Sequence, residues 1–230
     1  MEGDRRHQVE YCMLVKLFIL GLPGSGKSSV ARYIRTYAGD IGWASDHLND
    51  YGILQKMYMD DTEQKQFKPA EYDGFDIVDL TAFDIALQKL EFEVQRYISQ
   101  NQNKKLLLIE FSRNNYRHAF SQFSPEFLKD AYFLYLDVNV EICKDRIRKR
   151  ITNPSTANDY FVSDYIFNAY YNQDDGRCIP GILVRDFKIE DRRVKLINNR
   201  CPLQEASIKI TPFIDHIDLK ESSLQLARRY

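Results

Sequence analysis

The sequence lacks an apolar run long enough to cross a membrane, and its formal net charge is only -1. Its four cysteines are widely spaced, so no pair of them has the close spacing of a zinc or redox motif. These absences argue against a membrane protein, a zinc centre and a protein that binds nucleic acid through overall positive charge. The first ten residues are polar and highly charged and contain no signal-peptide apolar stretch, so we expect a cytoplasmic protein.

The composition is that of an ordinary globular protein, with 44% hydrophobic and 28% charged residues. No internal repeat and no low-complexity segment divides the 230 residues. We therefore expect one domain over residues 1–230. Nothing in the sequence indicates an oligomeric state, and we expect no membrane or nucleic-acid partner.

What the sequence does contain is a phosphate-binding motif, Gly-Leu-Pro-Gly-Ser-Gly-Lys-Ser, at residues 21–28. An apolar run at 13–20 precedes it and a helical pattern follows it, as a phosphate loop requires. The loop glycines let the backbone approach an anion, Lys27 can reach the β- and γ-phosphates of ATP, and the Ser28 hydroxyl is a ligand for Mg²⁺. The alternative is a glycine turn followed by a chance Lys-Ser pair. The predicted nucleotide-binding residues are Gly21, Pro23, Gly24, Ser25, Gly26, Lys27, Ser28 and Ser29.

Further apolar runs at 106–111, 132–138 and 193–199 alternate with helical patterns, of which 80–97 is the longest. Strands separated by helices predict a mostly parallel sheet with helices on both faces, a three-layer α/β fold. We also expect a short strand at 41–45. The tail predicts a strand near 207–210 and a helix near 219–229.

Ligands of parallel sheets bind at the carboxyl ends of the strands, where we expect Asp46, Glu110 and Arg113 beside the phosphate loop. Glu110 could bind Mg²⁺ or simply close its strand. Asp46 could accept the proton of an acceptor hydroxyl or only cap a helix, with His47 and Asp50 as secondary candidates. Arg113 could bind an anionic group of the acceptor or be an ordinary solvated side chain.

A basic helix at 140–151 carries Arg146 and Arg150 on one face. Such arginines can close over phosphates and neutralise charge during transfer, although a solvated basic face is the alternative. An aromatic cluster follows at 160–171 and suits either the packing of a lid or stacking on an acceptor base. We expect a lid at about 146–171 and an acceptor-binding insertion at about 47–78.

Together these motifs resemble the P-loop kinases that phosphorylate nucleosides, nucleotides, sugars or other small hydroxyl compounds. The resemblance covers residues 12–200, with Gly21–Ser28 similar to their Walker A loop and Tyr135–Arg150 similar to the strand and helix that introduce their arginine-bearing lid. Asp46 and the strand ending at Glu110 resemble the zeta-toxin and polynucleotide-kinase-like branch, in which an Asp after the second strand is the base. The chain lacks the Asp-Gly-Phe-Pro-Arg of adenylate kinases, the Asp-Arg-Tyr of thymidylate kinases and the Glu-Arg-Ser of deoxynucleoside kinases.

The sequence therefore predicts a P-loop NTPase fold and an ATP- and Mg²⁺-dependent phosphotransferase with a small hydroxyl or phosphate acceptor. Its catalytic residues would be Lys27, Asp46, Arg146 and Arg150. Asp46, Glu110 and Arg113 would bind the acceptor, and Ser28 and Glu110 the metal. The alternative is a regulatory nucleotide-binding protein or slow NTPase without a small-molecule acceptor, and a nucleic-acid end kinase is a third reading.

Overall fold

The computed structural model describes residues 14–101, 105–152, 161–171, 175–200 and 203–217. A five-stranded sheet in the order β2-β5-β1-β6-β7 forms its centre, and every neighbouring pair of strands is parallel. The strands are β1 (Leu14–Leu20), β2 (Ala44–Asn49), β5 (Lys105–Phe111), β6 (Tyr132–Asp137) and β7 (Val194–Asn198).

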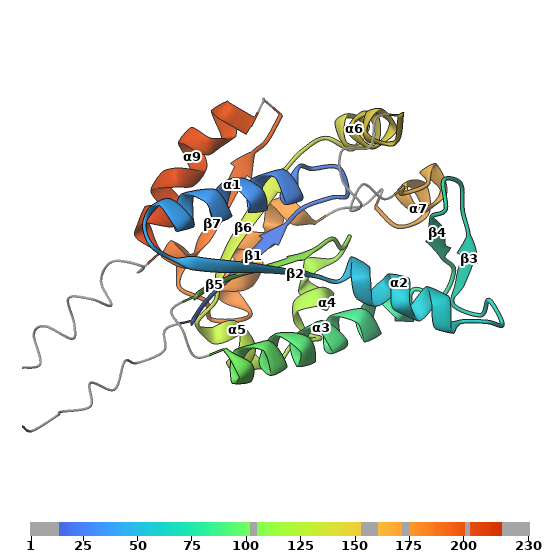
Figure 1. Ribbon diagram of the computed structural model, residues 1–230, viewed down its shortest axis with the longest axis horizontal. Coiled ribbons are helices and arrows are strands. Elements are labelled where there is room, and N and C mark those ends of the chain that lie inside the picture. Colours follow the sequence, from blue (N-terminus) through green and yellow to red (C-terminus); the bar gives the residue numbers. More distant parts are fainter. Residues whose placement is uncertain (1–13, 102–104, 153–160, 172–174, 201–202, 218–230) are drawn as a thin grey trace, which may run out of the picture.

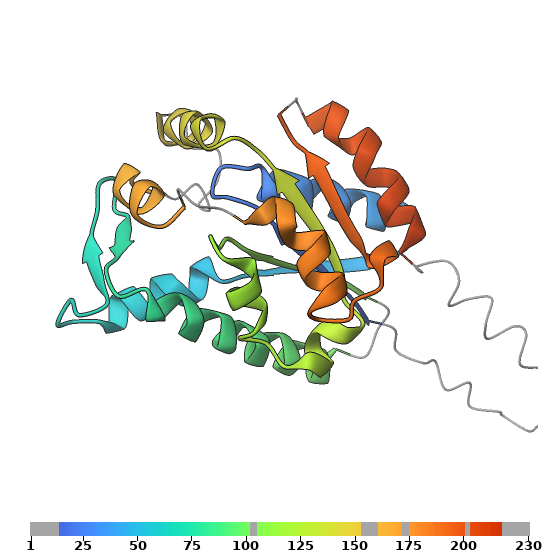
Figure 2. The same cartoon turned by 180° about the vertical axis from the view of Figure 1, so that it is seen from behind.

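Helices cover both faces of this sheet, which confirms the predicted three-layer α/β fold (Figures 1 and 2). One face is covered by α1 (Lys27–Asp40) and α9 (Leu203–His216). The other face is covered by α3 (Thr81–Gln100), α4 (Tyr116–Phe120), α5 (Pro125–Lys129) and α8 (Ile179–Arg185).

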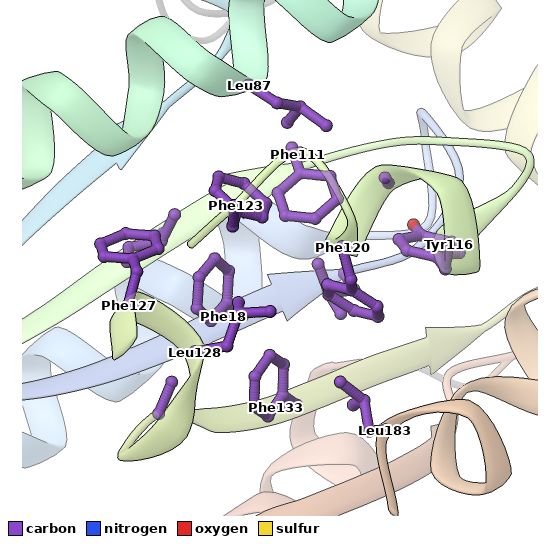
Figure 3. Close-up of a cluster of buried hydrophobic side chains, with 14 of the residues drawn as sticks. Phe18, Leu87, Phe111, Tyr116, Phe120, Phe123, Phe127, Leu128, Phe133 and Leu183 are labelled. Carbon is purple, nitrogen blue, oxygen red and sulfur yellow. The ribbon is translucent and has the colours of Figure 1, made fainter. Parts of the chain in front are cut away.

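The apolar run of β1 explains both layers, because successive side chains of a strand point to opposite faces. Leu17 and Ile19 pack on the side of α1 and α9, whereas Phe18 and Leu20 pack on the side of α3 and α4. Figure 3 shows Phe18 within an aromatic cluster, where its ring stacks on Phe133 with centroids 5.0 Å apart. The central strand is therefore buried on both faces, and its carboxyl end delivers the phosphate loop.

A smaller unit lies at the end of the molecule toward which β2 points (Figure 1). It contains α2 (Tyr51–Asp60) and an antiparallel pair, β3 (Phe67–Pro69) with β4 (Phe75–Ile77). Helices α6 (Val140–Thr152) and α7 (Asp164–Ala169) lie at the same end of the molecule.

The structure corrects three details of the predicted elements. Strand β2 runs four residues past the predicted strand at 41–45, and residues 207–210 lie within helix α9 rather than a strand. The β3–β4 pair was not predicted, because Pro69 and the polar residues around it hide a strand pattern. The predicted helix at 219–229 falls outside the described residues.

The remaining described elements are short, namely the 3₁₀ turns η1 (Gly176–Cys178) and η2 (Asp191–Arg193). Cys143 is buried and Cys178 is exposed. No helix in the described part of the chain combines the length and the apolar character needed to cross a membrane.

Candidate functional site

The phosphate loop connects β1 to α1, and two side chains from the segment after β5 fix its first residue. The Tyr116 hydroxyl accepts a hydrogen bond from the Gly21 amide at 2.9 Å, and the Ser112 hydroxyl donates to the Gly21 carbonyl at 2.8 Å. Tyr116 belongs to the aromatic cluster of Figure 3, so the buried core itself holds the start of the loop.

Two loop glycines are required by close approach as well as by backbone conformation. A Cβ atom on Gly24, whose φ is +79°, would lie 2.4 Å from the carbonyl oxygen of Cys143 on α6. A Cβ atom on Gly26, whose φ is +97°, would lie 2.8 Å from Nδ2 of Asn199. Side chains rarely adopt such positive φ values, and here they would also collide with α6 and with the segment after β7.

Lys27 opens helix α1 and is 4% exposed. Its ammonium donates to the carbonyls of Gly21 and Leu22 at 3.1 and 2.9 Å and to the Ser112 hydroxyl at 2.7 Å. Burial lowers its pKa below the ordinary lysine value, although the Glu110 carboxylate 3.9 Å away opposes that shift. The cation is therefore held inside the loop, at the amino end of α1 where anions bind.

Ser28 and Glu110 form a set of oxygen ligands next to Lys27. The Ser28 hydroxyl lies 3.3 Å from both carboxylate oxygens of Glu110, and His47 Nε2 lies 3.0 Å from one of them. Burial alone would raise the pKa of Glu110, but His47, Lys27 and Ser28 together bring it below its ordinary value. Hydroxyl and carboxylate oxygens fit Mg²⁺, which takes few protein ligands and completes its shell with water and phosphate oxygens. Among the described residues, no group of three or more His, Cys, Asp or Glu is placed to hold a metal ion.

Asp50 and Arg113 form a buried ion pair behind the loop. Asp50 follows β2 and is 7% exposed, and Arg113 follows β5 and is 2% exposed. The guanidinium donates to Asp50 Oδ2 at 2.5 Å and to the carbonyls of Ser112 and Phe83. Burial raises the pKa of the Asp50 carboxyl above its ordinary value, while the Arg113 charge opposes that shift. The alternative that Arg113 is a solvated side chain is therefore wrong.

Asp46 does not lie at this rim, and its predicted location is wrong. It sits within β2 opposite Leu107, three residues before the pair Asn49–Glu110. Its carboxylate accepts hydrogen bonds from the Tyr97 hydroxyl and from the Lys105 ammonium. The error arises because β2 continues through Asn49, so that Asp50 rather than Asp46 follows the end of the strand.

Helix α6 contacts the phosphate loop through Arg146. Its guanidinium donates to the carbonyls of Ser25 and Asn199 at 3.3 and 3.0 Å. The positive charge of Arg150 acts with burial to lower the pKa of Lys27. Arg146, one of the two arginines predicted from the basic helix, therefore contacts the phosphate loop. Part of the predicted lid, residues 153–160, lies outside the described residues.

A pocket adjoins the loop on the side of Asp50 and Arg113. Pro23 and Ser112 line it next to the loop, and Leu54 and Ile77 line it in the smaller unit. Its other lining residues are Asp50, Tyr51, Phe75, Phe83, Arg113, Phe161, Val162, Ile166 and Tyr171. The predicted residue Ser25 is fully buried in the loop, and Ser29 is exposed on the first turn of α1.

Sequence reasoning missed three polar residues of the site, namely Ser112, Tyr116 and Asn199. Asn199 donates to the Ser25 carbonyl at 2.8 Å. Ser112 and Asn199 each follow a core strand at its carboxyl end, so the rule that predicted Glu110 could have found them. Tyr116 is a buried aromatic residue in α4 and does not follow a strand directly, so this rule does not identify it as part of the site.

With this geometry in place, the chain can be compared with known proteins. A family model described as AAA domain matches residues 17–166. No curated protein matches the sequence.

Solved structures share the fold at low sequence identity. An unliganded sugar kinase from Janibacter sp. HTCC2649 is 15% identical with a TM-score of 0.56, over 88% of this chain and 95% of that chain. The APS kinase CysC of Mycobacterium tuberculosis, in complex with AMPPNP and APS, is 13% identical with a TM-score of 0.52, over 87% of this chain and 97% of that chain. These comparisons confirm the predicted P-loop kinase-like fold.

Proposed function

This chain belongs to the AAA domain family, and from that premise we propose that it is a kinase that transfers the γ-phosphoryl group of ATP to a small acceptor. The single observation that carries the proposal is the pocket at the phosphate loop. A site for nucleotide phosphates and a second, adjoining cavity with a buried carboxylate are what phosphoryl transfer to a second substrate requires. A regulatory nucleotide-binding protein would need only the site for the nucleotide phosphates.

Lys27 and the loop amides would hold the β- and γ-phosphates. The Lys27 ammonium would then exchange two neutral carbonyl acceptors for charged phosphate oxygens, which form stronger hydrogen bonds. Ser28 and Glu110 would hold Mg²⁺, which supplies positive charge against the transferred phosphoryl group when bound. Arg146 and Arg150 would add positive charge from α6.

Asp50 would take the role that the sequence assigned to Asp46. In the reaction the acceptor oxygen forms a bond to the γ-phosphorus while the bond from that phosphorus to the β-γ bridging oxygen breaks, which leaves ADP. The acceptor hydroxyl proton passes to the Asp50 carboxylate. Asp50 suits this role because it lines the pocket and its charge acts on Lys27.

The acceptor-binding side would be the unit of α2, β3 and β4, and the lid would include α6 and α7. Both parts line the pocket, through Leu54 and Ile77 on one side and Ile166 on the other. We therefore propose the segment at 47–78 as the acceptor-binding insertion and the segment at 146–171 as the lid.

The test is to incubate the purified protein with ATP and Mg²⁺, with and without a panel of small hydroxyl compounds, and to quantify both ADP and phosphorylated product. We expect at least one compound to yield product in proportion to ADP. Lys27→Ala should abolish product, whereas Lys105→Ala, which alters a lysine at the amino end of β5 and away from the phosphate loop, should retain it. Hydrolysis that no compound redirects would instead identify a slow NTPase.

A further inference from the structure

A third polar side chain, His47 of β2, lies against the pair Ser28 and Glu110. The kinase function proposed above, on which the inference below rests, assigns this pair to the metal. In the sheet register His47 is opposite Leu108, and Asn49 is opposite Glu110. Because side chains alternate between the two faces of a strand, His47, Leu108 and Glu110 share one face. Leu108 packs in the buried cluster of α1, so this is the face that α1 covers, with Ser28 in its first turn.

The three side chains are spaced as neighbouring ligands of one metal ion are. Nε2 of His47 lies 3.0 Å from Oε2 of Glu110, and the Ser28 hydroxyl lies 3.3 Å from both carboxylate oxygens. Ligand atoms at about 2.1 Å from an octahedral ion are about 3.0 Å from their nearest neighbours. The three residues belong to β2, β5 and α1, so the packing of these elements sets the spacing.

Hydrogen bonding does not account for the position of His47. Its Nε2 is buried and has no hydrogen-bond partner among the described residues, although the Glu110 carboxylate is only 3.0 Å away. A hydrogen bond requires the ring nitrogen to point at the acceptor oxygen. Ligands of one ion point at the ion between them and not at each other, which explains a close pair without hydrogen-bond alignment. A buried nitrogen without a partner costs free energy, and a bound ion would remove that cost.

An imidazole among the ligands changes which ion a site prefers. Mg²⁺ favours oxygen ligands and gives up its water reluctantly. A neutral imidazole nitrogen is a common ligand of transition metals, and the affinity of a mixed nitrogen and oxygen site rises from Mn²⁺ to Co²⁺. One nitrogen, one carboxylate and one hydroxyl should therefore favour Co²⁺ over Mg²⁺ by more than the two oxygen ligands would alone.

We infer that His47 is a direct ligand, through Nε2, of the metal that accompanies the nucleotide, and that it gives the site a preference for transition-metal ions over Mg²⁺. Ser28 and Glu110 supply the oxygen ligands, and phosphate oxygens and water complete the shell. Asp46, the preceding residue of β2, takes no part, because its carboxylate accepts hydrogen bonds from Tyr97 and Lys105.

Electron spin echo spectroscopy of the intact protein with ADP and Mn²⁺ tests this ligand directly and needs no turnover. Protein labelled with ¹⁵N in histidine alone should show a ¹⁵N coupling to Mn²⁺, which distinguishes an imidazole from the adenine ring. We expect His47→Ala still to bind ADP and Mn²⁺ and to lose the coupling. His118→Ala is the matched control and should retain it, because Nε2 of His118 lies 2.8 Å from a carboxylate oxygen of Asp84 on the exposed surface.

Calorimetry with ADP measures the preference between ions. The ratio of Co²⁺ to Mg²⁺ affinity should fall about tenfold or more in His47→Ala, whereas the Mg²⁺ affinity should change by less than about threefold. His47→Gln, whose amide carries an oxygen donor at a similar reach, should keep Mg²⁺ binding and lose the preference for Co²⁺. Urea denaturation shows whether each variant is folded. Equal losses for Co²⁺ and Mg²⁺ in folded variants would overturn the assignment, since a residue that only positions Glu110 affects both ions alike.

The outcomes separate this ligand from the kinase function. Mn²⁺ that binds with ADP and shows no histidine coupling overturns the role of His47 and leaves the kinase function intact. A coupling that depends on His47, in protein that phosphorylates none of the hydroxyl compounds, supports the metal ligand and contradicts the kinase. Absence of any binding of ADP with metal overturns both.

Discussion

Two clusters of charged side chains lie at opposite ends of strand β5, and they differ in depth. At the amino end of β5, Lys105 meets Asp46 and Tyr97, and the Asp46 side chain is 43% exposed. At the carboxyl end, Lys27 and Glu110 are 4% and 6% exposed. A lysine beside a carboxylate is common to both. Only the second cluster lies where the phosphate loop and the pocket meet, so position along the strand decides which acid–base pair is available for chemistry.

The largest expected effect is that of Lys27→Ala. Removal of the ammonium from the loop should lower kcat/KM for ATP by about a thousandfold or more, because a preorganised charge next to transferred phosphate is lost. Product formation under saturating acceptor measures it. Lys105→Ala should stay within about threefold of the unaltered protein, because Lys105 lies at the amino end of β5, away from the phosphate loop. Equal losses in the two variants would remove the distinction between the clusters.

Asp50→Asn tests the acid that follows β2, for comparison with Asp46 inside the strand. If Asp50 accepts the hydroxyl proton, its loss should lower kcat by about a hundredfold or more. It also removes the partner of Arg113, and breaking a buried pair costs about 3–5 kcal/mol of folding stability. Urea denaturation gives the stability, and kcat should be measured at a temperature where the variant remains folded. Retention of kcat in folded protein would exclude Asp50 as the base.

Much of the difference between the Lys105 cluster and the Lys27 cluster could be predicted from the sequence, and part of it could not. The Gly-Lys-Ser motif and the apolar run before it located Lys27 and Ser28, and the apolar run at 106–109 located Glu110. To choose between Asp46 and Asp50, one must know where β2 ends. This edge strand is half-exposed, and its sequence Ala-Ser-Asp-His-Leu-Asn contains no pattern that indicates its last residue. Tertiary contacts such as Tyr116 with Gly21 span 95 residues and leave no local pattern.

Gly24→Ala tests whether the cluster of Lys27 and Glu110 depends on the backbone of α6. The new methyl group would lie 2.4 Å from the Cys143 carbonyl at a φ of +79°, so loop or helix must move. We expect a loss of about 1–3 kcal/mol from backbone strain alone. Nucleotide binding should weaken in parallel, as calorimetry with ADP would show. Gly39→Ala, where a Cβ atom meets nothing within 4 Å, is the control.

The pH dependence of turnover should show the raised pKa of Asp50. The carboxylate form accepts the proton, so kcat/KM should fall as the pH decreases through that pKa. Because burial raises it, the fall should begin above the ordinary Asp value of 3.8. A pH–rate profile on protein checked for folding at each pH measures this. An acid limb at or below 3.8 would contradict the assignment.

The smallest effect is expected for Asp46→Asn. Hydrogen bonds from Tyr97 and Lys105 lower the pKa of Asp46, so they stabilise the fold when the carboxyl is ionised. This contribution is present above 3.8 and is lost as the pH falls through the lowered folded-state pKa. Because the side chain is half-exposed, we expect at most about 1 kcal/mol at neutral pH and little change in kcat. Urea denaturation at pH 7 and near pH 3 would show whether the difference between variant and parent disappears in acid.

The close approach of Gly24 to the Cys143 carbonyl has a consequence for the evolution of related sequences. A residue whose only role is to bind phosphate can be substituted once a protein no longer turns over nucleotide. Gly24 is also required by the main chain of α6, which no substitution on the helix can move aside. Relatives that have lost Lys27 should therefore still retain a glycine at this position, so that a bare Gly-x-Gly remnant in a divergent sequence would report the shape of the protein rather than its activity.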